Sequence, residues 1–184
     1  MSQNLRRFVR CVYALDAVVN RVEVEAWDNP SPCPEWTARE VLGHALTVVR
    51  LVGDTAAGAQ ARGPGPTETA GDDPLSTWAA ARDHTLEALD TQGVLRTERD
   101  TPFGHISVDS FLAGIYVDPL THTWDLAVAT GQPHGIAADL AAEAQATVVK
   151  IGDAIRGPGR MADPVPGDWH DPVASFAAFT GRRP

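Results

Sequence analysis

Hydrophobic residues recur at steps of three and four along most of the chain, which is the period of an amphipathic helix. The first stripe predicts a helix over about 4–26, with the apolar members Leu5, Phe8, Val12, Leu15, Val18, Val19 and Val22. The segment 28–32, which reads DNPSP, breaks this pattern. The chain therefore opens with a long helix and a turn.

Two local signals mark the next helix starts. Thr37 and Glu40 have the spacing of a capping box, so a second helix is predicted from about residue 38 to residue 59. Asp73 followed by Pro74 is typical of an N-cap with proline in the first turn, and predicts a third helix. The stretch 61–73 between them is rich in Gly and Pro and is predicted to be a loop.

The rest of the chain has less regular patterning. Residues 91–106 look irregular, with a short extended pair around Val94–Arg99. A fourth helix is predicted from Ser107 or Val108 to Gly131, a fifth over 137–155, and a short one over 173–179. These elements predict a single all-α domain over 1–184, a four-helix bundle with an additional C-terminal helix.

Charge and cysteine content exclude several classes of protein. The chain has 15 basic and 24 acidic residues, a formal charge of -9, which disfavours nucleic acid and membrane partners. The two cysteines, Cys11 and Cys33, do not form the framework of a secreted disulfide-rich protein. The N-terminal stretch superficially resembles a signal peptide, but its apolar part carries Asp16, Asn20 and Arg21, so an amphipathic helix is the better interpretation. A cytoplasmic location is expected.

Polar residues on apolar helical faces are the candidates for chemistry. His44 shares a face with Val41, Val48 and Leu51, so its side chain is expected to point into the bundle. In the fourth predicted helix, Asp118 and His122 lie on an equally apolar stripe. The apolar members of that stripe are Phe111, Ile115 and Leu126.

Asp118 and His122 are four residues apart, so their side chains stand one helical turn apart on the same face. With His44 from a facing helix they form a three-ligand set of the kind used by catalytic zinc sites, and nickel, iron or manganese also suit it. Two simpler interpretations stay open. The pair can be an ordinary ion pair, and Asp118 can belong to a turn because Pro119 follows it.

Three stretches resemble one known family. They are segment 31–44 (SPCPEWTAREVLGH), segment 118–131 (DPLTHTWDLAVATG) and the ending 176–184 (FAAFTGRRP). They are similar to actinobacterial DinB-like proteins related to mycothiol-dependent maleylpyruvate isomerase, in which Phe103-Gly104 also has a counterpart.

The resemblance implies a DinB-like four-helix bundle in which His44, Asp118 and His122 bind a divalent metal, usually zinc. It also implies that the metal activates a low-molecular-weight thiol for S-transfer or isomerisation. The family's acid is typically Glu, so the shorter Asp118 demands a closer approach of the helices. Pro119 removes an amide and frees the carbonyl of Ile115, which predicts a kink beside the site.

Other candidates surround this predicted centre. Trp36 and Trp124 are expected as wall or packing residues and are the candidates for cofactor binding. Arg82 and His84 are the catalytic candidates, able to hold an anion or supply a proton. Asp125 is expected to make a structural hydrogen bond, and its alternative role is to orient a ligand.

The leading hypothesis is a metal- and thiol-dependent transferase or isomerase that acts on a small electrophilic substrate. One alternative is a hydrolase or lyase that uses metal-bound water. Another is a non-catalytic bundle that binds a metal or small ligand. The expected partners are a small molecule or thiol, and the chain is expected to be a monomer or homodimer.

Overall fold

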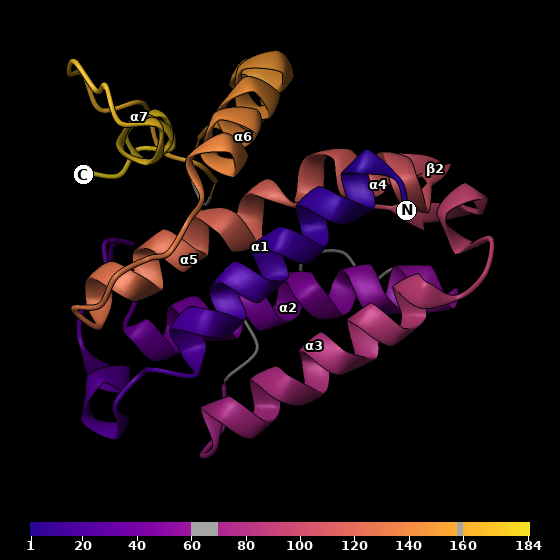
Figure 1. Ribbon diagram of the computed structural model, residues 1–184, viewed down its shortest axis with the longest axis horizontal. Helices are drawn as coiled ribbons and strands as arrows, with labels where there is room; N and C mark the ends of the chain where they lie inside the picture. The colour runs from indigo at the N-terminus through magenta and orange to yellow at the C-terminus, as the bar shows by residue number, and fades with distance from the viewer. Residues whose placement is uncertain (60–69, 158–159) are drawn as a thin grey trace.

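The computed structural model describes residues 1–59, 70–157 and 160–184, and helices dominate these segments (Figure 1). The part of the predicted loop over 60–69 lies outside the described residues. In chain order the elements are α1 (Gln3–Val19), η1 (Val24–Asp28), α2 (Ala38–Ala57), α3 (Pro74–Asp90), η2 (Val94–Arg96), β1 (Glu98–Thr101), β2 (Gly104–Ser107), α4 (Val108–Ile115), α5 (Val117–Ala129), α6 (Ala138–Ile151), η3 (Gly152–Ile155) and α7 (Pro172–Phe179).

Helices α1, α2, α3 and the bent pair α4–α5 form the bundle. α2 packs against both α3 and α5, and α1 packs against α4 and α5. α6 and α7 pack against each other and lie at one side of this bundle (Figure 1). The core is a continuous apolar cluster whose largest fully buried members are Trp78, Tyr116, Phe8, Phe111 and Phe176. The predicted all-α, DinB-like bundle is confirmed.

Side-chain caps fix the helix starts where the sequence predicted them. Thr37 Oγ1 accepts a hydrogen bond from the Glu40 amide, and the Glu40 carboxylate accepts one from the Thr37 amide, so the capping box is complete. Asp73 accepts from the Ser76 amide at 3.1 Å and starts α3. Ser107 starts α4 in the same way.

Two helices end earlier than their apolar stripes predicted. The first helix was expected to reach residue 26, but α1 ends at Val19. The Asn20 side chain bonds the Asp16 carbonyl at 2.8 Å there, and the chain then leaves the helix. The predicted helix over 137–155 ends at Ile151. Gly152 adopts a φ of 72° there, which does not continue an α-helix.

The extended pair lies further along the chain than predicted. Val94–Arg96 is a 3₁₀ turn rather than a strand. The strands are β1 and β2, which pair antiparallel with Glu98 opposite Ser107. Gly104, with a φ of 109°, allows the tight turn between them.

The predicted helix over 107–131 is two helices that meet at Tyr116. α4 ends at Ile115 and α5 begins at Val117, which places Pro119 in the first turn of α5, where a missing amide is tolerated. The buried Tyr116 hydroxyl hydrogen-bonds Thr147 of α6 at 2.7 Å and holds the bend. Asp118 consequently lies in the first turn of α5, where the helix dipole favours a carboxylate.

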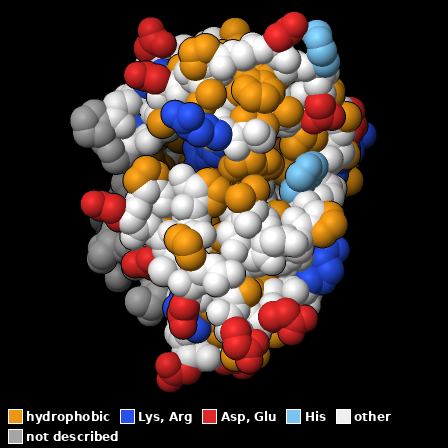
Figure 2. Space-filling model, turned by 90° about the vertical axis from the view of Figure 1, so that its left-hand side faces the viewer, with side chains coloured by type: hydrophobic (Ala, Val, Ile, Leu, Met, Phe, Trp, Pro, Cys, Tyr) orange, Lys and Arg blue, Asp and Glu red, His pale blue; other side chains and the backbone are white. Residues whose placement is uncertain are grey.

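One end of the molecule, which carries α7 and the end of α5, has a hollowed surface. Hydrophobic side chains gather around this hollow and basic side chains lie beside it (Figure 2). Within the described residues, no helix is both long and apolar enough to cross a membrane.

Candidate metal centre

His44, Asp118 and His122 meet between α2 and α5. His44 Nε2 lies 3.2 Å from Asp118 Oδ2, and His122 Nε2 lies 3.8 Å from the same oxygen. One ligand atom from each of the three residues lies within 4.8 Å of the others. The bundle therefore brings the three predicted ligands together.

These spacings suit a shared cation. Ligand atoms bonded tetrahedrally to zinc at about 2.0–2.1 Å lie roughly 3.3 Å from one another, close to the two nitrogen–oxygen distances found here. The second carboxylate oxygen, Asp118 Oδ1, is buried and accepts no hydrogen bond. A buried carboxylate with an unused oxygen is costly unless another positive group binds it. The donor set thus fits a divalent cation.

Burial and charge oppose each other within this triad. Burial alone raises the pKa of the Asp118 carboxyl, but the charge of His122 and the hydrogen bond to His44 outweigh it and lower that pKa. Burial likewise lowers the pKa of His44, and Asp118 more than reverses this shift, so the pKa of His44 is raised. Asp118 is thus the negative group that both histidines face.

A second layer of polar groups lies behind His122. His122 Nδ1 is 2.9 Å from Asp125 Oδ2, and the Asp125 side chain has no solvent exposure. Arg182 holds both oxygens of this carboxylate, with Nε 2.9 Å from Oδ1 and Nη2 2.7 Å from Oδ2. Burial raises the pKa of Asp125, but the hydrogen bonds from His122 and Arg182 prevail and leave it well below its usual range.

This arrangement selects one tautomer of His122. A carboxylate only accepts hydrogen bonds, so the contact with Asp125 places the proton of a neutral His122 on Nδ1. The lone pair is then on Nε2, which faces Asp118 and His44. Metal-ligating histidines in proteins are commonly held by a carboxylate in this manner.

Cys33 lies beside the same carboxylate. Its thiol donates to Asp125 Oδ2 at 3.2 Å, and burial together with the Asp125 charge raises its pKa to about 12. Cys33, His122 and Asp125 also lie close enough to form an alternative ligand set. Both oxygens of Asp125 already accept hydrogen bonds from Arg182, however, whereas Asp118 Oδ1 accepts none. The geometry favours the set with Asp118.

The two tryptophan candidates lie in different places. The Trp36 ring is half-buried, 5.2 Å from the His44 ring and 6.2 Å from the His122 ring, so it forms a wall of the centre. Trp124 is buried in the hydrophobic core. Only Trp36 contacts the imidazole rings of the triad.

The structure does not bring Arg82 and His84 to this centre. Arg82 binds Asp16 of α1 and its neighbour Asp83. His84 lies 3.0 Å from Asp54, which is ten residues, or about 15 Å, along α2 from His44. Both candidates therefore link helices elsewhere in the bundle.

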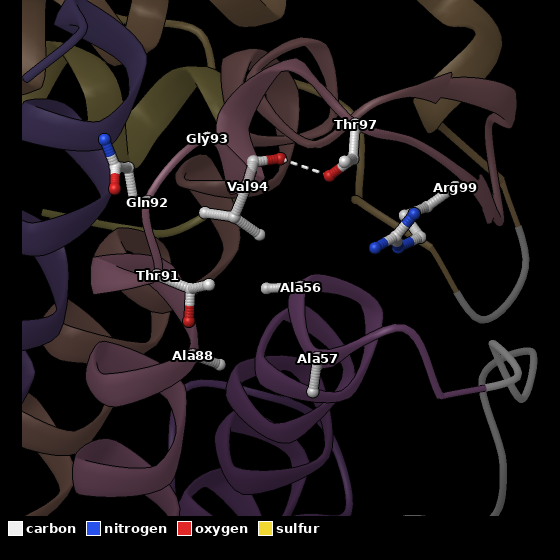
Figure 3. A pocket seen from close by; sticks show the side chains of 9 residues that line it. All are labelled: Ala56, Ala57, Ala88, Thr91, Gln92, Gly93, Val94, Thr97 and Arg99. Atoms are coloured by element: carbon white, nitrogen blue, oxygen red, sulfur yellow. Dashed lines mark hydrogen bonds between the residues drawn. The ribbon is translucent and has the colours of Figure 1, made fainter.

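A partly open pocket of about 530 Å³ lies near the far end of α2 (Figure 3). Its lining residues are Ala56, Ala57, Ala88, Thr91, Gln92, Gly93, Val94, Thr97 and Arg99. Ala56 is twelve residues, or about 18 Å, along the helix from His44. None of these lining residues is a histidine, cysteine or carboxylate, so the pocket offers neither a metal site nor an acid–base pair.

The contact between Arg182 and Asp125 was not predicted from the sequence. Asp125 was expected to make a structural hydrogen bond, and it does bond His122 and Arg182. Arg182 follows Asp125 by 57 positions, and no helical periodicity links them. The ending 176–184, which contains Arg182 and resembles the family, was a sequence signal for this residue, but it did not identify Asp125 as the partner.

Comparisons with known proteins agree with this architecture. The model of the mycothiol maleylpyruvate isomerase N-terminal domain matches residues 8–127, a range that includes all three triad residues. Two proteins of Mycobacterium tuberculosis, from strains CDC 1551 and H37Rv and both described as uncharacterised, are 31% identical to this chain over 172 residues, 92% of each chain. No solved structure matches the chain significantly. The chain belongs to the family of the mycothiol maleylpyruvate isomerase N-terminal domain.

Proposed function

We propose that this protein is a metal-dependent enzyme that activates a low-molecular-weight thiol of the mycothiol type for S-transfer to, or isomerisation of, a small electrophilic substrate. The observation that carries the proposal is the convergence of His44, Asp118 and His122, with one oxygen of Asp118 buried and unpartnered. The family to which the chain belongs supports the thiol.

Three protein ligands leave room for a further ligand on a divalent cation, of which zinc suits this donor set best. A cation at such a site lowers the pKa of a bound thiol or water. The residues of the chain would bind the cation and orient its ligands. His44 and His122 offer nitrogen ligands, and Trp36 covers one side of both imidazole rings.

The chain's own thiols do not suit the role of nucleophile. Burial raises the pKa of the Cys33 thiol to about 12, so it stays protonated and donates to Asp125. Cys11 is fully buried in the core, and burial raises its pKa further. Both observations favour a nucleophile that enters from outside.

The proposal can be tested with purified protein that has been loaded with Zn²⁺ or stripped with a chelator. Each form is given a small thiol and an electrophile, and free thiol and product are both followed. We expect turnover that needs metal and thiol together and that is absent from His44→Ala. His170→Ala, which removes an exposed histidine, is the matched control and should retain full activity.

Three other outcomes would count against the proposal. Product that forms with metal but without thiol would indicate hydrolysis or lyase chemistry. Metal binding without turnover would indicate a non-catalytic bundle. Thiol consumption that persists in the chelated protein would show that the reaction does not need the metal.

A further inference from the structure

The segment that follows α7 reaches the candidate metal centre through Arg182. Its guanidinium holds Asp125 with two hydrogen bonds, and Nη1 donates to the Thr180 carbonyl at 2.7 Å. Asp125 in turn holds Nδ1 of His122. Arg182 is outside residues 8–127, the range that matches the family model.

The backbone delivers Arg182 to this place with little freedom. The Arg182 amide donates to the Ala177 carbonyl at 2.9 Å, and Gly181 adopts a φ of 88°, so the end of α7 is closed by a left-handed turn. A Cβ on Gly181 would lie 2.6 Å from the Ala162 Cβ, so only glycine fits. The guanidinium is therefore held by main-chain geometry on one side and by Asp125 on the other.

Asp125 Oδ2 accepts three hydrogen bonds, from Arg182, His122 and Cys33, at 2.7, 2.9 and 3.2 Å. Asp125 Oδ1 accepts from Arg182. Two of these four bonds come from Arg182. Because one bond ends on each oxygen, together they fix the orientation of the carboxylate plane. Without them the carboxylate can rotate, and it no longer holds the His122 ring in one orientation.

We propose that Arg182 is a positioning residue of the metal centre. Through Asp125 it fixes the ring orientation and tautomer of His122, so docking of the segment after α7 sets the affinity for the cation. The inference rests on the proposed metal centre and extends it to a residue that does not touch the metal. Partners of this kind typically change metal affinity by about 10–100-fold.

The test compares Arg182→Met with Arg183→Met in the full chain. The adjacent Arg183 is exposed, so its variant is matched in charge and position. Zn²⁺ affinity is measured by competition with a chromophoric chelator. We expect Kd to rise about 10–100-fold in Arg182→Met and to stay unchanged in Arg183→Met.

A second readout separates positioning from a general loss of structure. Nitrogen-15 NMR of metal-free protein should report a single Nδ1–H tautomer for His122 in the wild type and a mixture in Arg182→Met. Arg182→Lys keeps the charge but not the two-pronged contact, so it should restore only part of the affinity. It also carries the test if Arg182→Met does not fold.

The possible failures are distinguishable. If the wild type binds Zn²⁺ through the triad and both Arg182 variants bind it equally well, the inference is overturned while the metal centre stands. An equal loss in Arg183→Met would also overturn it, because a general charge effect would then explain the result. If the wild type itself does not bind Zn²⁺, the proposed function fails first.

Discussion

Two of the polar clusters between helices of this bundle each contain an acid, and they differ in the groups that face it. In the α1–α3 cluster, Asp16 Oδ1 accepts from Trp78 Nε1 at 2.9 Å and from Arg82. In the α2–α5 cluster, Asp118 Oδ2 faces two imidazole nitrogens, and Asp118 Oδ1 has no partner. The first acid faces permanent donors, and the second faces groups that can also bind a metal.

Solvent exposure does not separate the two clusters. The Arg82 and Asp16 side chains are 22% and 19% exposed, and those of His44 and Asp118 are 30% and 29% exposed. The kind of partner separates them. Arginine and indole can only donate, so they serve Asp16 as hydrogen-bond donors, whereas imidazole nitrogens can also act as metal ligands. We therefore expect the α1–α3 cluster to stabilise the fold and the α2–α5 cluster to bind the metal of the proposed function.

The largest expected effect comes from His44→Ala. Removal of a direct ligand should lower Zn²⁺ affinity by more than about 100-fold, beyond the range typical of indirect partners. The His44 side chain is 30% exposed, so water can replace part of its hydrogen bond to Asp118, and the free energy of unfolding of metal-free protein should fall by about 1 kcal/mol. Chelator competition and urea unfolding measure the two quantities. Undiminished affinity would remove His44 from the centre.

The next largest effect is expected for Asp16→Ala, which should change the stability of the fold but not the affinity for Zn²⁺. This change leaves Arg82 and Trp78 without their shared acceptor, so the free energy of unfolding should fall by about 2–3 kcal/mol. Zn²⁺ affinity should not change. Asp83→Ala removes the exposed partner of the same arginine and should leave both quantities within experimental error. A loss of metal binding in Asp16→Ala would erase the distinction between the clusters.

The smallest effect tests the start of α2, which carries His44. Hydrogen bonds from the Thr37 amide and hydroxyl lower the pKa of Glu40 below its ordinary value of 4.5. A lowered pKa means that the stabilisation is present above that ordinary value and is lost as pH falls through the folded-state pKa. The stability difference between wild type and Glu40→Ala should therefore be present at neutral pH and shrink in acid. A difference that stays constant with pH would contradict the role of the ionised carboxylate.

The helix starts and the inward faces of His44, Asp118 and His122 could be predicted because their signals are local, and the family resemblance implied that the three residues form one site. Thr37 and Glu40 satisfy each other within one turn, and Asp118 and His122 share a face because they are four residues apart. His44 needed only the phase of its own helix. The capping box and the shared helical faces depend on helical geometry alone, so they can be predicted without knowledge of the tertiary fold.

Other features depend on contacts between distant segments. The bend at Tyr116 is held by Thr147 of α6, and the partner of Asp125 comes from beyond α7. Arg82 was a catalytic candidate because it could hold an anion, and only the packing of α3 on α1 gives it Asp16 as its partner. The sequence singled out Asp118 and Asp125 as polar residues with a role, but it could not pair Asp125 with Arg182 or Asp16 with Arg82.

X-ray absorption at the zinc edge, on stoichiometrically loaded protein free of small thiols, identifies the ligands of the proposed metal centre. We expect one zinc ion with only nitrogen and oxygen neighbours at about 2.0–2.1 Å, and loss of two-histidine scattering in His44→Ala. A sulfur neighbour at about 2.3 Å would instead point to Cys33 with His122 and Asp125. That result, or a protein that binds no metal at all, would contradict the assignment of His44, Asp118 and His122.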